Sequence, residues 1–359
     1  YSQSKFKTNE SLIEESKKIL TDLNKDTIRD KSELELRYNA LLNVMDSKLK
    51  DSYKSNFKTF VGYPDYEDPL FNTKIALKKE FNINKIPPRG KMSKDEKEDM
   101  SKQLCDPMHN SKKKEDITFN LTHNQKFLKT FLSPHTPYNS MLLFHGTGVG
   151  KTCSSISIAE QYSDELKKLN KKIIILLNPS IEANFIKNIF NIQKVIKGTP
   201  YYQCTGSKYL DEIKIDLDIF DSISDEMVQK IQYKINKIIK GRYEFYGYQK
   251  FANLIENLQR NVKEKHNETN YNHYLNKKLK ERFSNTVMII DEVHNIKQSS
   301  ELKVLPPLLE KVVTNAINMK LLLLSATPMF DTSNEIIFLI NLMLRNDNSL
   351  NLTQRRERL

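Results

Sequence analysis

The sequence predicts an α/β fold in which a parallel sheet is covered by helices on both faces. From residue 117 onward, short apolar runs alternate with longer helical stretches. These runs are MLLF at 141–144, IIILL at 173–177, VMII at 287–290 and LLLL at 321–324. Wholly apolar strands are typical of a sheet that is buried on both faces, and the segments between them are long enough for crossover helices.

Composition supports a folded core and narrows the class of protein. Of the 359 residues 38% are hydrophobic, while no apolar run approaches the roughly 20 residues that span a bilayer. We therefore expect no membrane contact and, with no signal peptide in the opening residues, an intracellular protein. Cys105, Cys153 and Cys204 form no CxxC pair, which predicts neither a disulfide framework nor a zinc site and fits a reducing compartment. The net charge of +12 permits binding to a polyanion, although a solvated lysine surface explains it equally well.

Residues 1–116 are expected to form a mainly helical region followed by a linker. Ser11 and Glu14 read as a capping box, and apolar residues at helical spacing predict two amphipathic helices within residues 11–50. Their apolar faces suit either docking of a partner or packing on the rest of the chain. The polar run at 86–102 is the candidate linker.

The α/β domain is expected to cover residues 117–345. Between its second and third apolar runs lies a long stretch rich in Tyr and Lys, which predicts an insertion at about 198–285. Its tyrosines and lysines suit contact with nucleic acid bases and phosphates, or simply packing. Residues 346–359 would begin a linker to a further domain.

A glycine-rich loop follows the first apolar run. It reads His145-Gly146-Thr147-Gly148-Val149-Gly150-Lys151-Thr152 and leads into a helical stretch. The backbone N–H groups of such a loop point at phosphates, and the N-terminus of the following helix adds positive potential. We therefore predict a nucleotide site in which the loop binds the phosphates, Lys151 reaches the β- and γ-phosphates and Thr152 binds Mg²⁺.

An acidic box, Asp291-Glu292-Val293-His294, follows the third apolar run. A carboxylate at the end of a strand can hold Mg²⁺, so Asp291 is the second candidate metal residue. The neighbouring Glu292 can orient or deprotonate an attacking water. After the fourth run, Ser325-Ala326-Thr327 offers hydroxyl groups that can hydrogen-bond His294 or Glu292 and sense the γ-phosphate.

In this order, GTGVGKT, DEVH and SATP resemble motifs I, II and III of the superfamily 2 helicases and translocases. The resemblance implies a RecA-like domain that hydrolyses ATP with Mg²⁺ and couples hydrolysis to movement on nucleic acid. It also implies catalytic roles for Lys151, Asp291, Glu292 and His294. Two weaker matches follow from it: Gln125 stands where the family often reads adenine, and Asn178-Pro179-Ser180 stands at motif Ia, which touches the nucleic-acid backbone.

A narrower resemblance comes from YPDYEDPLFN, from FLSPHTPYNSMLLFHGTGVGKT and from SATPMFDTSNEIIFLINLML. These segments are similar to the helicase-like early transcription factor large subunit, and to related viral NTPases, of poxviruses and other large cytoplasmic DNA viruses. That resemblance implies an ATPase acting on duplex DNA, with viral RNA polymerase or a second transcription factor subunit as partner through the N-terminal helices. It also implies location in the virion and the host cytoplasm.

Superfamily 2 motors need arginines from a second RecA-like domain, and no QxxGRxxR stretch is present. We expect that half to lie further along a longer chain or on a partner. Three alternatives stay open at this point: an RNA helicase, a restriction-type motor, and a nucleotide-binding scaffold or virion structural protein with little turnover. A GTPase is disfavoured, because no guanine-reading NKxD occurs.

Overall fold

A computed structural model describes residues 63–85, 121–146, 148–196, 203–214, 224–265, 267–298, 304–329 and 333–347, with single positions at 15, 18, 93, 95 and 98. The chain divides into two compact units, Tyr1–Lys85 and Ile86–Leu359. The described part of the first unit contains helices α5 (Phe71–Leu77) and α6 (Lys79–Asn82). Apart from two helical positions, Glu15 and Lys18, the helices expected within 11–50 lie outside the described residues, as do the linker expected at 86–102 in most of its length and the segment 348–359.

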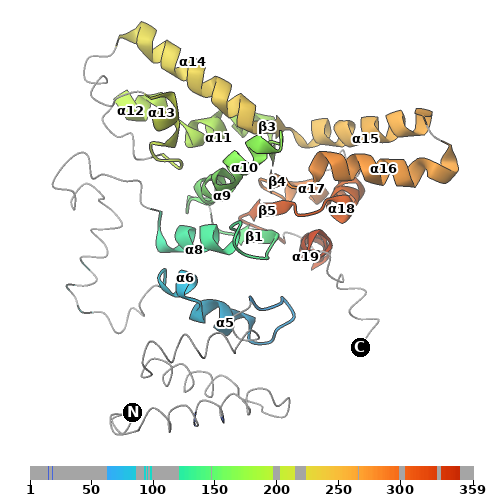
Figure 1. The fold of residues 1–359 in the computed structure, drawn as a ribbon, viewed down its shortest axis with the longest axis horizontal. Coiled ribbons are helices and arrows are strands. Elements are labelled where there is room, and N and C mark those ends of the chain that lie inside the picture. The colour runs from blue at the N-terminus through green and yellow to red at the C-terminus, as the bar shows by residue number, and fades with distance from the viewer. Residues whose placement is uncertain are drawn as a thin grey trace. The chain divides into compact units, whose positions relative to one another are not determined.

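The second unit is built on a parallel sheet of five strands, ordered β1-β5-β4-β2-β3 (Figure 1). The strands are β1 (Ser140–Phe144), β2 (Ile173–Leu176), β3 (Tyr243–Tyr246), β4 (Val287–Ile290) and β5 (Lys320–Ser325). Each of the four predicted apolar runs is a strand, and β2, β4 and β5 are buried along their whole length. The α/β class with a RecA-like parallel sheet is confirmed.

Strand β3 is the element that the sequence analysis missed. It lies inside the segment expected as an insertion and pairs in parallel with β2, with Ile173 opposite Tyr243. Its sequence, YEFY, includes a charged residue, and only Tyr243 is fully buried, as suits a strand at the edge of the sheet. An edge strand of four residues gives no apolar run, so the pattern that revealed the other strands does not reveal this one.

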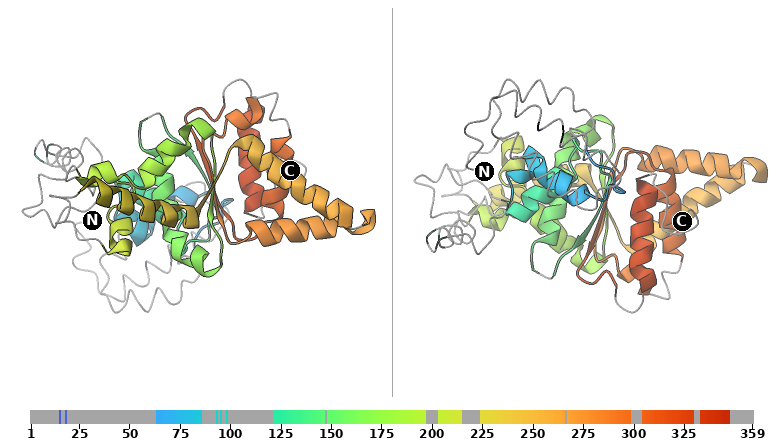
Figure 2. Two further views of the ribbon diagram at one scale, coloured as in Figure 1. Left: turned by 90° about the horizontal axis from the view of Figure 1, so that it is seen from above. Right: turned by 90° about the horizontal axis from the view of Figure 1, so that it is seen from below.

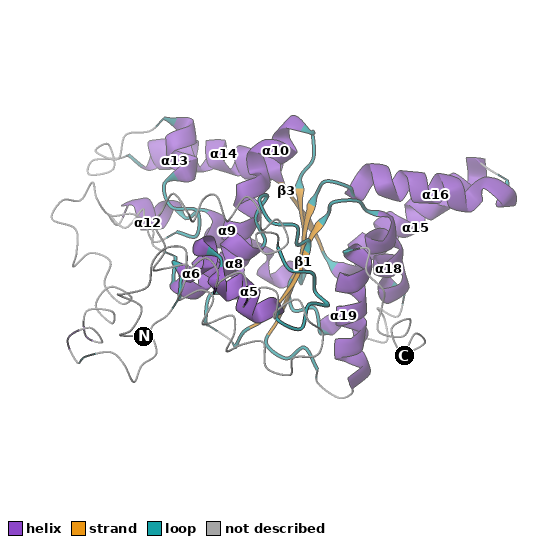
Figure 3. Ribbon diagram, turned by 60° about the horizontal axis from the view of Figure 1, so that its bottom comes forward, coloured by secondary structure: helices purple, strands orange, loops and turns teal. Residues whose placement is uncertain are grey.

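Helices cover both faces of the sheet (Figures 2 and 3). One face carries helices that precede β1 or lie between β1 and β3: α8 (His123–Phe131), α9 (Lys151–Ala159), α10 (Ser163–Lys168), α11 (Glu182–Ile189), α12 (Ile192–Ile196), α13 (Lys208–Ile213) and α14 (Asp225–Arg242), with 3-10 turns η4 (Glu160–Tyr162) and η5 (Pro179–Ile181). The other face carries α15 (Tyr248–Lys265), α16 (Glu268–Phe283), α18 (Leu305–Asn315) and α19 (Ser333–Asn346), while the short α17 (Asn295–Gln298) packs on α18. Helices α15 and α16 form a hairpin that extends beyond the sheet (Figure 1).

The core on the α15–α19 face is a single apolar cluster. Side chains from β2, β4 and β5 meet aromatic and aliphatic residues of these helices, including Phe251 and Phe283, whose rings contact edge to face. Burial of this apolar surface is the main term that stabilises the arrangement. It also fixes the positions at which the strands end, and these positions define the site described below.

On the opposite face, the segment 203–213 is fastened to the helix that follows the glycine-rich loop. Cys204 forms a disulfide with Cys153 of α9, contrary to the expectation from cysteine spacing. The buried Glu160 carboxylate accepts hydrogen bonds from the hydroxyl groups of Tyr209 (2.7 Å) and Tyr243 (2.5 Å) and pairs with Lys208 at 2.7 Å. These bonds tie α13 and β3 to the end of α9.

None of the helices in the described ranges is both long enough and apolar enough to cross a membrane.

Candidate nucleotide-binding site

The predicted motifs converge because all five strands are parallel. Their carboxyl ends meet at one edge of the sheet, and β5 lies between β1 and β4. The loop after β1 therefore lies beside the loop after β5, which lies beside the box after β4. Phe144 at the end of β1 is in register with Ser325 at the end of β5, so motifs that are far apart in sequence leave the sheet at the same level.

The glycine-rich loop has the backbone that binds phosphate. Gly148 and Gly150 adopt left-handed φ angles of 78° and 87°, which a residue with a side chain rarely adopts. Gly150 caps the N-terminus of α9, so Lys151 is the first helical residue. Among the residues that the structure describes, none has an atom within 4 Å of where a Cβ at Gly146 or Gly148 would stand, so they leave this side of the loop open to a ligand. Val149 is exposed, and Thr147 lies outside the described residues.

Lys151 lies along this loop. Its Nζ donates to the carbonyl oxygens of His145 at 2.9 Å and Gly146 at 3.3 Å, and the residue is only 9% exposed. The ammonium is thus held at the centre of the loop by neutral acceptors. Phosphate oxygens are stronger partners for an ammonium than carbonyl groups, so this side chain is poised to change partners when a nucleotide binds.

Gln125 lies against the loop, and its role as an adenine reader stays a prediction. Its Nε2 is 2.8 Å from the position of a Cβ added to Gly150. The side-chain oxygen accepts a hydrogen bond from the N–H of Thr122 at 3.0 Å, which completes a capping box at the start of α8. The structure therefore brings Gln125 to the site and assigns its oxygen to holding α8.

The acidic box forms a turn directly after β4. Asp291 is 6% exposed, and its Oδ1 accepts a hydrogen bond from the N–H of Glu292 at 3.1 Å. Burial raises the pKa of the Asp291 carboxyl to about 6; the Glu292 charge raises it further, while that hydrogen bond and the Lys151 charge oppose the rise. Glu292 is half-buried and has a left-handed φ of 46°.

The box is bonded to the loop after β5, as the sequence analysis expected. His294 Nδ1 lies 3.0 Å from Ser325 Oγ, and the same oxygen accepts from the N–H of Thr327 at 3.0 Å. His294 Nδ1 also lies 3.4 Å from Glu292 Oε2. Ala326, between Ser325 and Thr327, lies in the same turn. Two segments separated in sequence, the acidic box and residues 325–327, thus share one chain of polar contacts.

The residues at this edge fit a magnesium ion. A carboxylate and a hydroxyl are oxygen donors of the kind that Mg²⁺ prefers, and Asp291 and Thr152 supply one each. Asp291 is a buried carboxylate whose raised pKa reports that its negative charge is poorly compensated. A divalent cation beside it would supply that compensation.

The loop after β2 carries the predicted motif Ia. Asn178 caps the turn η5: its Oδ1 accepts from the N–H of Ser180 at 3.1 Å and from the Ser180 hydroxyl at 3.0 Å. Asn178, Pro179 and Ser180 are all exposed at the same edge of the sheet. They lie on the surface where a polymer could contact them.

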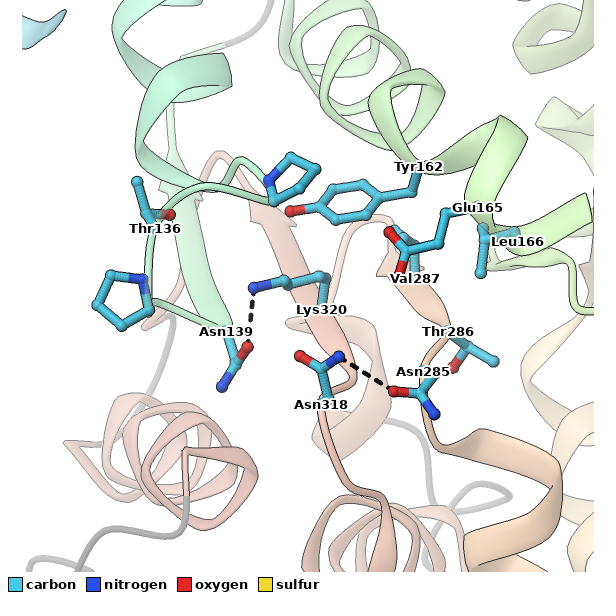
Figure 4. A pocket seen from close by; sticks show the side chains of 12 residues that line it. Thr136, Asn139, Tyr162, Glu165, Leu166, Asn285, Thr286, Val287, Asn318 and Lys320 are labelled. Atoms are coloured by element: carbon cyan, nitrogen blue, oxygen red, sulfur yellow. Dashed lines mark hydrogen bonds between the residues drawn. The ribbon is translucent and has the colours of Figure 1, made fainter. Parts of the chain in front are cut away.

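A different cavity lies at the opposite edge of the sheet, where the strands begin (Figure 4). It has a volume of about 200 Å³. Lys320 Nζ donates to the Tyr138 carbonyl at 3.0 Å and to Asn139 Oδ1 at 2.9 Å, and Asn318 donates to Asn285 at 3.0 Å. Lys320 and Asn318 thus have hydrogen-bond partners at this edge, and these bonds close the end of the sheet.

With this geometry in place, comparison with known proteins defines the class. The family described as "Type III restriction enzyme, res subunit" matches residues 119–330. The chain belongs to this family, and its fold is that of the superfamily 2 helicases. The match spans the glycine-rich loop, the acidic box and the Ser325–Thr327 turn.

The chain is also similar to named proteins of large DNA viruses. It is 31% identical over 287 residues to "Putative ATP-dependent RNA helicase R563" of Acanthamoeba polyphaga mimivirus, which covers 80% of this chain and 40% of that protein. It is 29% identical to "Putative helicase 087L" of Invertebrate iridescent virus 3, over 62% of this chain and 20% of that protein. It is 26% identical to "Putative helicase 009L" of Frog virus 3, over 63% of this chain and 20% of that protein. The chain thus spans less than half the length of each of these relatives.

Proposed function

We propose that this chain is the first motor domain of an ATP-dependent nucleic-acid translocase that acts on duplex DNA in viral transcription. The observation that carries the proposal is the meeting of three loops at one edge of the sheet. There Lys151, the Asp291–Glu292 pair and the His294–Ser325 hydrogen bond lie on adjacent strands.

Each residue has a step that its position supports. The loop N–H groups and the N-terminus of α9 bind the phosphates, and Lys151 exchanges its carbonyl partners for phosphate oxygens. Thr152 and Asp291 would hold Mg²⁺, which would offset the negative charge of the phosphates. Glu292 orients the attacking water and takes its proton.

Ser325 and His294 provide the coupling step. Their hydrogen bond joins the loop after β5 to the acidic box, so a change at the γ-phosphate that moves the box also moves this loop. The exposed Asn178-Pro179-Ser180 loop at the same edge is the proposed contact with the nucleic-acid backbone. Hydrolysis and nucleic-acid contact would then take place at one edge of the sheet.

Duplex DNA is favoured by the resemblance to the viral transcription ATPases and is compatible with the charge of +12. RNA is the second candidate, because two similar mimivirus proteins carry the name of RNA helicases. We place the protein in the virion and the host cytoplasm. Its proposed partners are viral RNA polymerase or a second transcription factor subunit, which would dock on the N-terminal helices.

ATP turnover by the longest natural form of the chain tests the proposal. It is measured alone and with duplex DNA, single-stranded DNA and RNA, with Glu292→Gln as the inactive reference. Glu165→Gln, which changes a carboxylate at the opposite edge of the sheet, is the matched control. Strong stimulation by duplex DNA supports the proposal, and preferential stimulation by RNA replaces the DNA assignment with RNA. No turnover with any nucleic acid overturns the motor function in favour of a nucleotide-binding scaffold.

A further inference from the structure

Tyr248 reaches the acidic box from a different part of the sheet. It is the first residue of α15, directly after β3 and Gly247, and it is 9% exposed. Its hydroxyl donates to the backbone carbonyl of Asp291 and lies 3.3 Å from the carbonyl oxygen of Glu292. Burial and the Asp291 charge raise the pKa of Tyr248, so the phenol remains a protonated donor at neutral pH.

These two carbonyl groups converge because of the backbone at Glu292. In an extended chain successive carbonyl groups point to opposite sides. The left-handed φ of 46° at Glu292 breaks this alternation and lets both oxygens face one donor. A conformation that is rare for a residue with a side chain persists only when its surroundings hold it.

The rest of the turn is fixed from the opposite direction. The N–H of Asp291 donates to Leu176 of β2 at 2.9 Å, and the N–H of Val293 donates to Leu324 of β5 at 2.9 Å. The N–H groups of Asp291 and Val293 are thus bonded to the neighbouring strands. The Asp291 carbonyl accepts from Tyr248, while the Glu292 carbonyl, which lies near the same hydroxyl, also accepts from the N–H of Asn295 at 3.0 Å. No other side chain in the described ranges is shown donating to these two oxygens.

Tyr248 is itself held in place. A Cβ on Gly247 would lie 3.0 Å from Cγ of Pro179, so the chain passes close to the loop after β2 at this point. The N–H of Leu177 bonds the carbonyl of Tyr246 at 3.0 Å, which continues the pairing of β2 with β3 up to this junction. The Tyr248 side chain therefore projects from a rigid junction at which the ends of β2 and β3 are held together.

We propose that Tyr248 is a positioning residue of the nucleotide site, whose hydroxyl holds the Asp291–Glu292 turn in the conformation that aims both carboxylates. The role rests on the proposed ATP hydrolysis. Among the described contacts, Tyr248 touches neither the glycine-rich loop nor Lys151, so we expect the reaction step, which needs Glu292 in place, to depend on Tyr248 more strongly than nucleotide binding does.

The test is Tyr248→Phe in the longest natural form of the chain. We expect kcat for ATP to fall about tenfold, the scale of one lost hydrogen bond, while KM changes by less than about twofold. The matched control is Tyr246→Phe, which removes a hydroxyl two residues away that is bonded to Glu244 at 3.1 Å and Arg282 at 3.2 Å and not to the box. This control should retain the wild-type kcat.

A second variant separates the hydrogen bond from packing. Replacing Tyr248 by 4-aminophenylalanine keeps an N–H donor on a ring of nearly the same shape and should restore most of the lost kcat. This comparison decides the matter even where Tyr248→Phe lowers the melting temperature. An active wild type with unchanged kcat in Tyr248→Phe, or no recovery with 4-aminophenylalanine, overturns the positioning role alone. Absence of turnover in the wild type overturns the proposed function and this role with it.

Discussion

The two edges of the sheet are formed by the opposite ends of the same strands, and the buried charged groups at these edges have different surroundings. At the carboxyl edge the loops contain three residues with left-handed backbone, Gly148, Gly150 and Glu292. The buried Asp291 carboxylate lies at the same edge, and its pKa is raised to about 6.

At the amino edge the Lys320 ammonium donates to the Tyr138 carbonyl and to Asn139 Oδ1, and Figure 4 draws the second of these bonds. Left-handed backbone also occurs at this edge, at Asn285 and Asn318. The edges therefore differ in the partners of the buried charge, because the neighbour of Asp291 is the like-charged Glu292, whereas Lys320 has two oxygen acceptors.

The difference between the two edges indicates where a ligand can bind. A buried charge beside a like charge costs stability unless a ligand offsets it, so a fold tolerates this arrangement where it binds something. Mutual hydrogen bonds between buried groups stabilise the fold and leave nothing for a ligand to satisfy. Substitutions at the carboxyl edge should change turnover, and substitutions at the amino edge should change stability.

The largest effect is expected for Lys151→Ala at the carboxyl edge. Turnover should fall by roughly 10²–10³-fold or more, because a positive group aimed at developing phosphate charge is lost. The fold should be retained, since Lys151 Nζ bonds only the carbonyl groups of His145 and Gly146 among the described contacts. Steady-state ATP turnover and circular dichroism check the two parts. A variant that unfolds would show that the lysine supports the loop rather than the ligand.

The next largest effect is expected from removing the disulfide between Cys153 and Cys204, which should lower stability. Cys153 and Cys204 are separated by 51 residues, and closing a loop of that size stabilises a folded chain by about 2–4 kcal/mol. Cys204→Ser should lower the free energy of unfolding in urea by that amount under oxidising conditions, with turnover per folded molecule preserved. Cys105→Ser is the matched control. Equal stability of the two variants would show that the disulfide does not form in solution.

A feature could be predicted from the sequence where the residues that form it are close together along the chain. The strands β2, β4 and β5 and the loops that follow them could be predicted, because apolar runs and the motifs after them are local in sequence. Strand β3 could not, since its residues YEFY become a strand only by pairing with β2. The Cys153–Cys204 bond and the contact of Tyr248 with the acidic box depend on that same placement of distant segments, so spacing alone gave no signal for either.

Two glycines sharpen the contrast within the carboxyl edge. Gly148→Ala and Gly150→Ala both place a side chain at a left-handed φ, at a cost of about 1–2 kcal/mol. Only at Gly150 does the new Cβ also meet Gln125, whose Nε2 would be 2.8 Å away. Urea unfolding should therefore show a larger loss for Gly150→Ala, and this excess should disappear when each of the two substitutions is made in a Gln125→Ala background, which removes the clash while holding the loss of the α8 capping box constant. Equal losses at the two positions would mean that Gln125 moves aside freely.

At the amino edge, Lys320→Met is expected to change stability without changing turnover. Removing the ammonium leaves the Tyr138 carbonyl and Asn139 Oδ1 without their donor, which costs about 1–3 kcal/mol of stability, and kcat should not change. Differential unfolding in urea and ATP turnover measure the two quantities. A fall in kcat with stability intact would place Lys320 in a functional site and break the contrast between the edges.

The difference in stability between the wild type and Lys320→Met should change with pH in a direction that follows from the pKa of Lys320. Burial lowers the pKa of Lys320 below its ordinary value of 10.5, although the charges of Asp347 and Glu165 oppose the shift. Between the lowered folded pKa and 10.5 the unfolded chain binds more protons than the folded chain, so the free energy of unfolding rises with pH. The stability advantage of the wild type over Lys320→Met should therefore be larger at pH 10 than at pH 7, because groups common to both proteins cancel. If the stability advantage of the wild type over Lys320→Met were smaller at pH 10 than at pH 7, the charged form of Lys320 would be the one that the fold favours. The amino edge would then hold an ion pair rather than a set of neutral hydrogen bonds.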